Sequence, residues 1–333
     1  MCSLFGLIDY KGVLNSRTKN HILNTLARIC EARGTDATGI AYHSGGKLCI
    51  YKRPLPAHRV KFRVPPDVKV VMGHTRMTTQ GNAKFTQNNH PFRGQIEHAQ
   101  FALAHNGVLW NDRTLRLTEN LPQTSIETDS YIAVQLLEKY KALDFQSLKC
   151  MAEKVEGSFV FTVLDRKDAI WFVKGDNPLA IFCYDGFLLY ASTEALLLQA
   201  EYRLRLHHTS KIEAKEGEIL RIDRKGEVSR GSFIPKNTYR HFWRQYPYWP
   251  DSCLVDEPEI TEQDGLLDAA KAMGVSEDEV QMLIDYGCEP EEIEELLYCP
   301  SILHELLGEL RYSGIVKKTA HPHCALRPLD HCA

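Results

Sequence analysis

The residue of this chain best suited to covalent chemistry is a cysteine at position 2. If Met1 is removed, Cys2 carries both a thiol nucleophile and a free α-amine. Such an amine has a pKa of about 7.7–8.0, so near neutral pH it can accept the thiol proton and later return it to a leaving group. No separate histidine base is then required. The alternative is that Cys2 is simply a small residue near the terminus.

Polar clusters later in the chain could form a binding site around this nucleophile. They are His74-Thr75-Arg76, His105-Asn106-Gly107 and Glu127-Thr128-Asp129. Arg76 can bind a carboxylate through its planar fork, and Asp129 can accept hydrogen bonds from an ammonium group. Asn106 and the N–H of Gly107 could stabilise negative charge that develops on a carbonyl oxygen under attack. Singly, the two charged residues could form surface ion pairs, and Asn106-Gly107 could be a hairpin turn.

Apolar runs next to these clusters predict the strands that would position them. A buried strand is predicted over Leu4–Asp9, directly after Cys2. Two further strands, Val68–Gly73 and Phe101–Ala104, each end where a polar cluster begins. Because side chains at the ends of neighbouring strands can converge, this arrangement favours a functional site.

The rest of the N-terminal region alternates between helical and strand patterns. Apolar residues at helical spacing predict one helix that ends near Gly34 and two helices between Asp129 and Val155. A hairpin is predicted around Ser44-Gly45-Gly46. Further strands are predicted at Phe159–Leu164, Ile170–Val173, Leu179–Cys183, Leu188–Ala191 and Ile219–Ile222. This order is typical of an α/β or α+β core with two sheets.

The pattern changes after about residue 250. Residues 251–264 are acidic and interrupted by proline, which predicts a linker. Residues 265–313 carry apolar residues at helical spacing and predict a small module of three short helices. Residues 314–333 are predicted to be a loose tail. No metal site is predicted there, because no zinc-finger spacing relates its candidate ligands His321, His323, Cys324, His331 and Cys332.

The composition is that of a folded protein with no excess of positive charge. Apolar residues make up 44% of the chain, charged residues 25%, and the formal net charge is −3. The chain has no basic leader, no run of about 18 apolar residues and no C-x-x-C pair among its 10 cysteines. We therefore expect a cytoplasmic protein without nucleic-acid or membrane partners. The absence of glycine-rich nucleotide fingerprints predicts no organic cofactor.

The order of these polar motifs resembles the glutaminase domain of class II glutamine amidotransferases. The family segment Gly-His-Thr-Arg-Trp-Ala-Thr-x-Gly is similar to residues 73–81, and its His-Asn-Gly and Glu-Thr-Asp motifs match residues 105–107 and 127–129. Weaker similarities extend over roughly residues 2–235. They are Arg33-Gly34-Thr35-Asp36-Ala37-Thr38-Gly39, Asn89-His90-Pro91, Glu156-Gly157-Ser158-Phe159 and Ala191-Ser192-Thr193-Glu194.

The resemblance implies a four-layer αββα sandwich of the N-terminal-nucleophile hydrolase type over residues 2–250, an α+β fold, followed by the small helical region. It also implies hydrolysis of L-glutamine to glutamate and ammonia through a γ-glutamyl thioester on Cys2. The implied catalytic residues are Cys2, Asn106 and Gly107, and the implied substrate-binding residues are Arg76, Asp129, His74 and Thr79. His74 could equally be a buried, hydrogen-bonded histidine, and His90 and His105 are interpreted as structural.

Two residues depart from the family pattern, and they keep alternatives open. Met77 stands in place of a frequent tryptophan and Gln80 in place of a frequent histidine. One alternative is therefore hydrolysis of another γ-glutamyl or acyl amide by Cys2, and a second is a non-catalytic binding module. About 80 residues follow residue 250, too few for the acceptor domains of well-known family members. Ammonia is thus expected to pass to an acceptor protein in trans, and self-association into a homo-oligomer is left open.

Overall fold

The computed structural model describes residues 2–97 and 99–236, and, in the C-terminal region, residues 267, 270, 271, 275–288, 293, 296, 297 and 300–313. The chain divides into two compact units, Met1–Pro247 and Tyr248–Ala333. The first unit contains every polar motif named above. The segment predicted as a linker, residues 251–264, and the tail at 314–333, with its histidines and cysteines, lie outside the described residues.

The first unit is built from strands that alternate with a few helices. Its strands are β1 (Ser3–Ile8), β2 (Ala37–Ser44), β3 (Lys47–Arg53), β4 (Val70–Arg76), β5 (Phe92–Ile96), β6 (Ala99–Leu109), β7 (Gly157–Leu164), β8 (Ile170–Lys174), β9 (Ala180–Tyr184), β10 (Phe187–Ala191), β11 (Ser210–Lys211), β12 (Glu218–Ile222) and β13 (Val228–Ser232). Its helices are α1 (Ser16–Cys30), α2 (Asp112–Thr118), α3 (Tyr131–Tyr140), α4 (Phe145–Lys154) and α5 (Glu194–Leu204).

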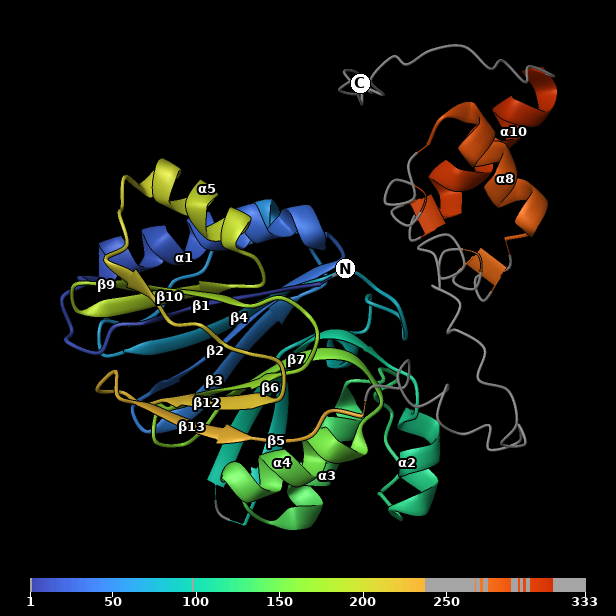
Figure 1. Ribbon diagram of the computed structural model, residues 1–333. Helices are drawn as coiled ribbons and strands as arrows, with labels where there is room; N and C mark the ends of the chain where they lie inside the picture. Colours follow the sequence, from blue (N-terminus) through green and yellow to red (C-terminus); the bar gives the residue numbers. More distant parts are fainter. Residues whose placement is uncertain are drawn as a thin grey trace, which may run out of the picture. The chain divides into compact units, whose positions relative to one another are not determined.

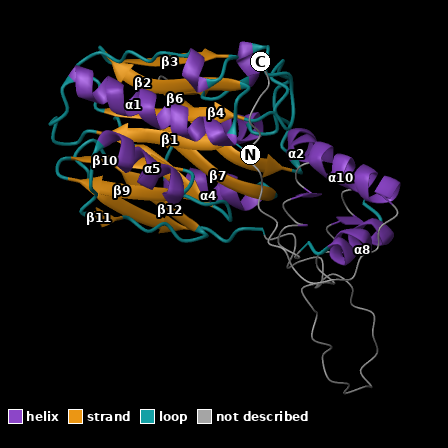
Figure 2. Cartoon of the chain, turned by 90° about the horizontal axis from the view of Figure 1, so that it is seen from above, coloured by secondary structure: helices purple, strands orange, loops and turns teal. Residues whose placement is uncertain are grey.

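Two antiparallel sheets lie face to face between two layers of helices (Figure 1). One sheet has the strand order β11-β9-β10-β1-β4-β2-β3 and the other β13-β12-β8-β7-β6-β5. Helices α1 and α5 cover the outer face of the first sheet, as the view from above shows (Figure 2), and α3 and α4 cover the outer face of the second. The predicted four-layer αββα sandwich is therefore confirmed.

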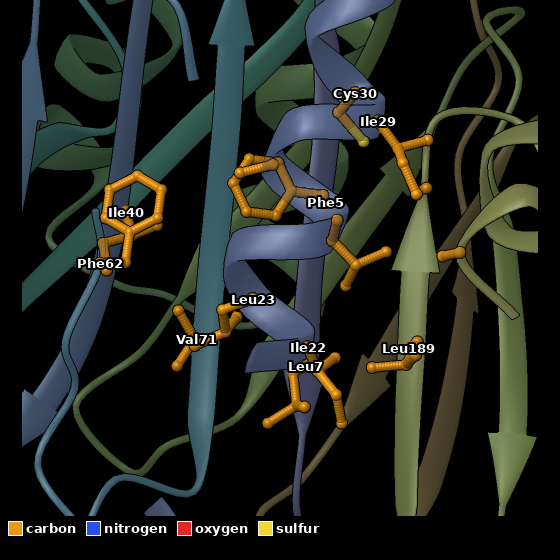
Figure 3. Close-up of a cluster of buried hydrophobic side chains, with 14 of the residues drawn as sticks. Phe5, Leu7, Ile22, Leu23, Ile29, Cys30, Ile40, Phe62, Val71 and Leu189 are labelled. Atoms are coloured by element: carbon orange, nitrogen blue, oxygen red, sulfur yellow. The ribbon is translucent and has the colours of Figure 1, made fainter. Parts of the chain in front are cut away.

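Strand β1 packs on both of its faces, because side chains alternate along a strand. Leu4 and Ile8 enter the apolar core between the two sheets. Phe5 and Leu7 enter the core between the first sheet and α1, where they meet α1 residues such as Ile22 (Figure 3). Each such side chain contributes about 1.5–3 kcal/mol when it is fully buried. The start of β1 is thus held by two cores.

The helix predicted before Gly34 from its apolar spacing corresponds to α1. The helix begins after Asn15, whose side chain accepts a hydrogen bond from the Thr18 N–H. Its end differs from the prediction: the α-helix stops at Cys30, and a 3-10 turn (Glu31–Arg33) follows. Gly34 is in an extended conformation, with φ of −178°, and so is not a left-handed helix cap. The chain needs this extended residue because it enters β2 directly afterwards.

The cluster around Asn106 lies inside a strand and not beyond its end. Strand β6 continues to Leu109, and residues 106 and 107 pair with Val160 and Phe159 of β7. The hairpin-turn alternative for Asn106-Gly107 is therefore wrong. Elements that the sequence did not predict include β5, β13, α2 and α5.

The second unit has a small apolar core of its own. Helices α8 (Glu277–Tyr286) and α10 (Pro300–Ser313) contribute Val280, Leu283, Leu303 and Leu307 to it. Helix α8 begins with a capping box between Ser276 and Glu279. Across the part of the chain that the structure describes, no helix is both long enough and apolar enough to cross a membrane.

Candidate active site

The Cys2 thiol lies at the start of a central strand, next to the end of β4. The register pairs Ser3 with Thr75, so Cys2 comes level with the last residue of β4. Its sulfur lies 3.4 Å from Met77 N and 3.3 Å from Met77 O, and Arg33 Nε donates to its carbonyl oxygen at 3.2 Å. Cys2 is only 9% exposed, and this burial raises the pKa of its thiol. A base is therefore needed to make the nucleophilic thiolate.

Charges of both signs act on this thiol. Burial has the largest effect and raises the pKa of Cys2; a backbone hydrogen bond with Met77, the charge of the amino terminus and Arg76 lower this pKa, and Asp129 raises it. Both residues are almost fully buried, at 3% exposure each. A cation and an anion close to one nucleophile can bind a zwitterionic molecule.

Arg76 is anchored to the segment that follows β4. Its Nη1 donates to Asn89 Oδ1 at 2.6 Å, and its Nη2 donates to the main-chain oxygens of Gln80 at 2.5 Å and Gly81 at 3.1 Å. All three oxygens are uncharged. Among the residues that the structure describes, no ion pair neutralises the guanidinium of Arg76, so it can still attract a carboxylate.

Asp129 is fixed between the end of β6 and the start of α3. Its Oδ2 accepts from Leu109 N at 2.7 Å, and its Oδ1 accepts from Ser130 Oγ at 3.3 Å. A carboxylate has about four acceptor positions. Asp129 therefore keeps acceptor capacity for an ammonium group.

Asn106 presents an amide without partners. It is 1% exposed, and neither its Nδ2 nor its Oδ1 has a hydrogen-bond partner among the described residues. A buried polar group left without a partner costs roughly 1–3 kcal/mol. Such a group is expected where a ligand supplies the missing hydrogen bonds.

The N–H of Gly107 is not used by the neighbouring strands. Gly107 lies opposite Phe159, whose own N–H bonds Asp176 Oδ1 at 2.9 Å and whose carbonyl oxygen accepts from Gly175 N at 3.0 Å. The N–H and C=O of Phe159 therefore point away from β6. Two residues that lie directly opposite each other in an antiparallel ladder share this orientation, so the N–H and C=O of Gly107 point away from β7. On the other side, pairing with β5 ends at Leu103. The Gly107 N–H is thus left available as a donor.

Only glycine fits at position 107. Its φ is +143°, and a Cβ there would come within 1.8 Å of Ser158 O. A side chain would therefore displace the backbone next to this donor.

Histidines join the two sheets beneath the site. His74 Nε2 faces the carbonyl oxygen of His105 at 3.0 Å and so donates to it, and the His74 ring lies 4.2 Å from the ring of His90. Burial lowers the pKa of His74 to about 3, and it also lowers the pKa values of His90 and His105. These rings are therefore neutral near pH 7; those of His74 and His105 are hydrogen-bonded, whereas the ring nitrogens of His90 have no partner among the described residues.

The structure brings six of the seven predicted site residues into one buried region. Thr79 is the exception, because it is exposed and lies outside this group. Sequence reasoning gave no role to Asn89, which bonds Arg76, or to Asn177, which donates to Asn106 O at 2.9 Å. Asn89 belongs to the Asn89-His90-Pro91 motif, whereas Asn177 stands in the short connection between the predicted strands Ile170–Val173 and Leu179–Cys183.

The Glu127 motif holds the segment after β4. Glu127 Oε2 accepts from Asn82 N at 3.1 Å and from Asn88 Nδ2 at 2.8 Å. Asn89 Nδ2 donates to Ala83 O at 2.7 Å within the same segment. A hollow of about 730 Å³, lined in part by Gln80 and Glu127, adjoins it. The segment after β4, which contacts the Cys2 sulfur through Met77, is therefore held by several hydrogen bonds and borders a hollow.

Comparisons with known proteins agree with this geometry. Residues 74–199 match the model of a glutamine amidotransferase domain family. The glutamine–fructose-6-phosphate aminotransferase (isomerizing) of Staphylococcus aureus is 30% identical over 263 residues, covering 73% of this chain and 42% of that protein. The protein of the same name from Streptococcus pyogenes is 28% identical over 263 residues, covering 75% and 43%. The chain thus spans less than half the length of the curated relatives that it matches.

Solved structures share the fold. Glutamine phosphoribosylpyrophosphate amidotransferase from B. subtilis superimposes with a TM-score of 0.54 at 22% identity, over 70% of this chain and 49% of that one. The allosteric regulatory enzyme of purine biosynthesis gives a TM-score of 0.57 at 20% identity, over the same shares of the two chains. At such identities the similarity shows the fold alone. The family match over residues 74–199 and the curated relatives, together with this fold, show that the first unit is a class II glutamine amidotransferase domain of the N-terminal-nucleophile type.

Proposed function

We propose that this domain hydrolyses L-glutamine to L-glutamate and ammonia, with Cys2 as the nucleophile. The observation that carries the proposal is the position of the buried Cys2 sulfur, which contacts Met77 and comes level with the buried Arg76; the charges of Arg76 and of the buried Asp129 both act on it. Glutamine is a zwitterion at neutral pH. Its α-carboxylate would bind Arg76 and its α-ammonium would bind Asp129, which leaves the side-chain amide to reach the sulfur.

The first half of the reaction forms a thioester. Once the residue before Cys2 is removed, the α-amine of Cys2 accepts the thiol proton, which compensates for the raised pKa of the buried thiol. The sulfur attacks the amide carbon, and the C–S bond forms. The α-ammonium then protonates the leaving nitrogen, the C–N bond breaks, and ammonia departs from the γ-glutamyl thioester.

The second half of the reaction restores the enzyme. The α-amine removes a proton from water, and the oxygen attacks the thioester carbon. The C–S bond breaks, glutamate leaves, and the sulfur recovers its proton. In both halves the Asn106 amide and the Gly107 N–H stabilise the negative oxygen, and loss of one such donor commonly costs about 10²–10³ in rate.

We also propose that the ammonia is used by an acceptor protein in trans. The support is that the matched relatives are named as aminotransferases between glutamine and fructose-6-phosphate, whereas the similarity covers 42% and 43% of their length. A partner that co-purifies with the full chain is expected to raise its glutaminase rate severalfold, because acceptor enzymes gain from coupled ammonia release. An ammonia assay with and without this partner checks the expectation, and an identical rate in both would count against it.

Replacement of the nucleophile tests the proposed chemistry. We expect Cys2→Ala to lower glutamine hydrolysis by at least about a thousandfold, because no other group can form the thioester. Cys150→Ala is the matched control, since Cys150 is a free, partly exposed thiol on α4 and should leave the rate unchanged. Ammonia release gives the rates, and N-terminal sequencing shows whether Cys2 carries the free amine. Retained activity in Cys2→Ala, or an intact Met1 in active protein, would contradict the proposal.

The role of Asp129 can be tested with a substrate that lacks the ammonium group. Asp129→Asn keeps an oxygen for Leu109 N but loses its charge. We expect it to lower kcat/KM for glutamine about 100-fold, because a buried charge pair is broken. For glutaramate, which is glutamine without its α-amine, the same variant should change kcat/KM by no more than about threefold. Equal losses with both substrates would mean that Asp129 acts only on the structure.

The pH dependence should report the α-amine and not the buried histidines. The amine must be neutral to act as a base, so kcat/KM should fall about tenfold per pH unit below its pKa, which is about 7.7–8.0 in an ordinary terminus. The pKa of His74 is about 3, so no step is expected near pH 6.5. His74→Gln should therefore keep the shape of the profile in steady-state assays from pH 5 to 9. An inflection near pH 6.5 that this variant removes would contradict the assignment.

A further inference from the structure

The side chain of Asn177 lies against the peptide group that links Asn106 to Gly107. Its Nδ2 donates to Asn106 O at 2.9 Å. The same nitrogen lies 2.8 Å from the position that a Cβ on Gly107 would take. None of the steps proposed so far uses this side chain.

The segment that carries Asn177 is itself firmly held. It follows β8, and it meets the main chain of Phe159 through Gly175 N and Asp176 Oδ1. Lys174 Nζ donates to the carbonyl oxygens of Gly175 at 2.8 Å and Asp176 at 3.4 Å. Asn177 is therefore presented to the 106–107 peptide from a fixed support.

Holding one end of a peptide group also fixes its other end. A trans peptide is planar, so the C=O of Asn106 and the N–H of Gly107 point in opposite directions within one plane. Glycine leaves the torsion after this plane unusually free, and the φ of +143° at Gly107 is one that other residues rarely adopt. In the β6–β7 register Asn106 O also faces the N–H of Val160, so Asn177 supplies a second donor to this oxygen and helps to fix the direction of the Gly107 N–H. It also polarises the peptide and strengthens that N–H as a donor, by roughly 10–30% per bond.

We propose that Asn177 is a positioning residue that aims the Gly107 N–H at the oxyanion formed during catalysis. The inference rests on the proposed function, because that function gives the Gly107 N–H its role. Asn177 acts through the shared peptide and does not itself touch the substrate. Its loss should therefore weaken the stabilisation of the transition state and leave the binding of the ground state unchanged.

The sharpest variant is Asn177→Asp, which keeps the shape but replaces the donor by an acceptor-only carboxylate. In the full chain we expect kcat for glutamine to fall about tenfold, less than for direct loss of an oxyanion donor. KM for glutamine and the inhibition constant of L-glutamate should stay within about twofold. Asn177→Ser, which keeps a shorter donor, should lose less activity than Asn177→Asp.

Two controls separate positioning from general damage. Asn111 makes the same kind of bond elsewhere, with its Nδ2 2.9 Å from Lys154 O, so Asn111→Asp should leave kcat unchanged. The rate at which iodoacetamide alkylates Cys2 measures thiolate reactivity without an oxyanion in the hole. This rate should be the same in the wild type and in both Asn177 variants.

The outcomes distinguish this inference from the proposed function. A wild-type glutaminase whose Asn177→Asp variant keeps full kcat would overturn the positioning role alone. The role would also be overturned if the loss of kcat came with an equal loss of glutamate affinity or of Cys2 alkylation, because those changes indicate a disturbed fold. A wild-type chain with no glutaminase activity would overturn both proposals together.

Discussion

The central position of β1 in the seven-stranded sheet is the constraint on which the rest of the site depends. The strand pairs with β4 on one edge and β10 on the other, and all six of its residues are buried. Leu4 and Phe5, which follow Cys2 and Ser3 in the chain, belong to cores on opposite faces of the sheet. Any displacement of Cys2 would have to break two ladders and loosen both cores. A reactive group that directly precedes such a strand is as rigid as the core itself.

The electrostatics of the site follow from the way the two sheets meet. The bond between His74 Nε2 and His105 O connects β4 of one sheet with β6 of the other. Burial keeps both rings neutral, and a neutral hydrogen-bonded ring costs little in a medium of low dielectric constant. Among the described residues, the almost fully buried charges that act on the thiol are then Arg76 and Asp129, while the half-buried Arg33 bonds the carbonyl oxygen of Cys2. This simple pair matches an amino acid without the competing charge that a protonated histidine would add.

The sequence predicted the parts of the site whose chemistry is visible in single residue types. Arg76, Asp129 and Asn106 stood out because charged and amide groups are unusual next to apolar runs, and the double-sheet fold followed from the same runs. The sequence could not show that Asn106 lies inside a strand, because a functional amide breaks the apolar pattern there. Nor could it assign Asn177, whose contact spans 71 positions of the chain. Local pattern identifies candidates for chemistry, whereas long-range packing decides which neighbours orient them.

Arg76 binds the segment after β4 by hydrogen bonds to the carbonyl oxygens of residues 80 and 81. A carbonyl oxygen is the same chemical group whatever side chain its residue carries. The side chain at position 80 can therefore change without loss of these hydrogen bonds to Arg76. The side chain of Met77, which is 42% exposed, takes no part in them either. Proteins that share this backbone contact can therefore differ in the side chains that surround it. The side chain of Gln80 takes no part in this contact, because Arg76 bonds only its main-chain oxygen.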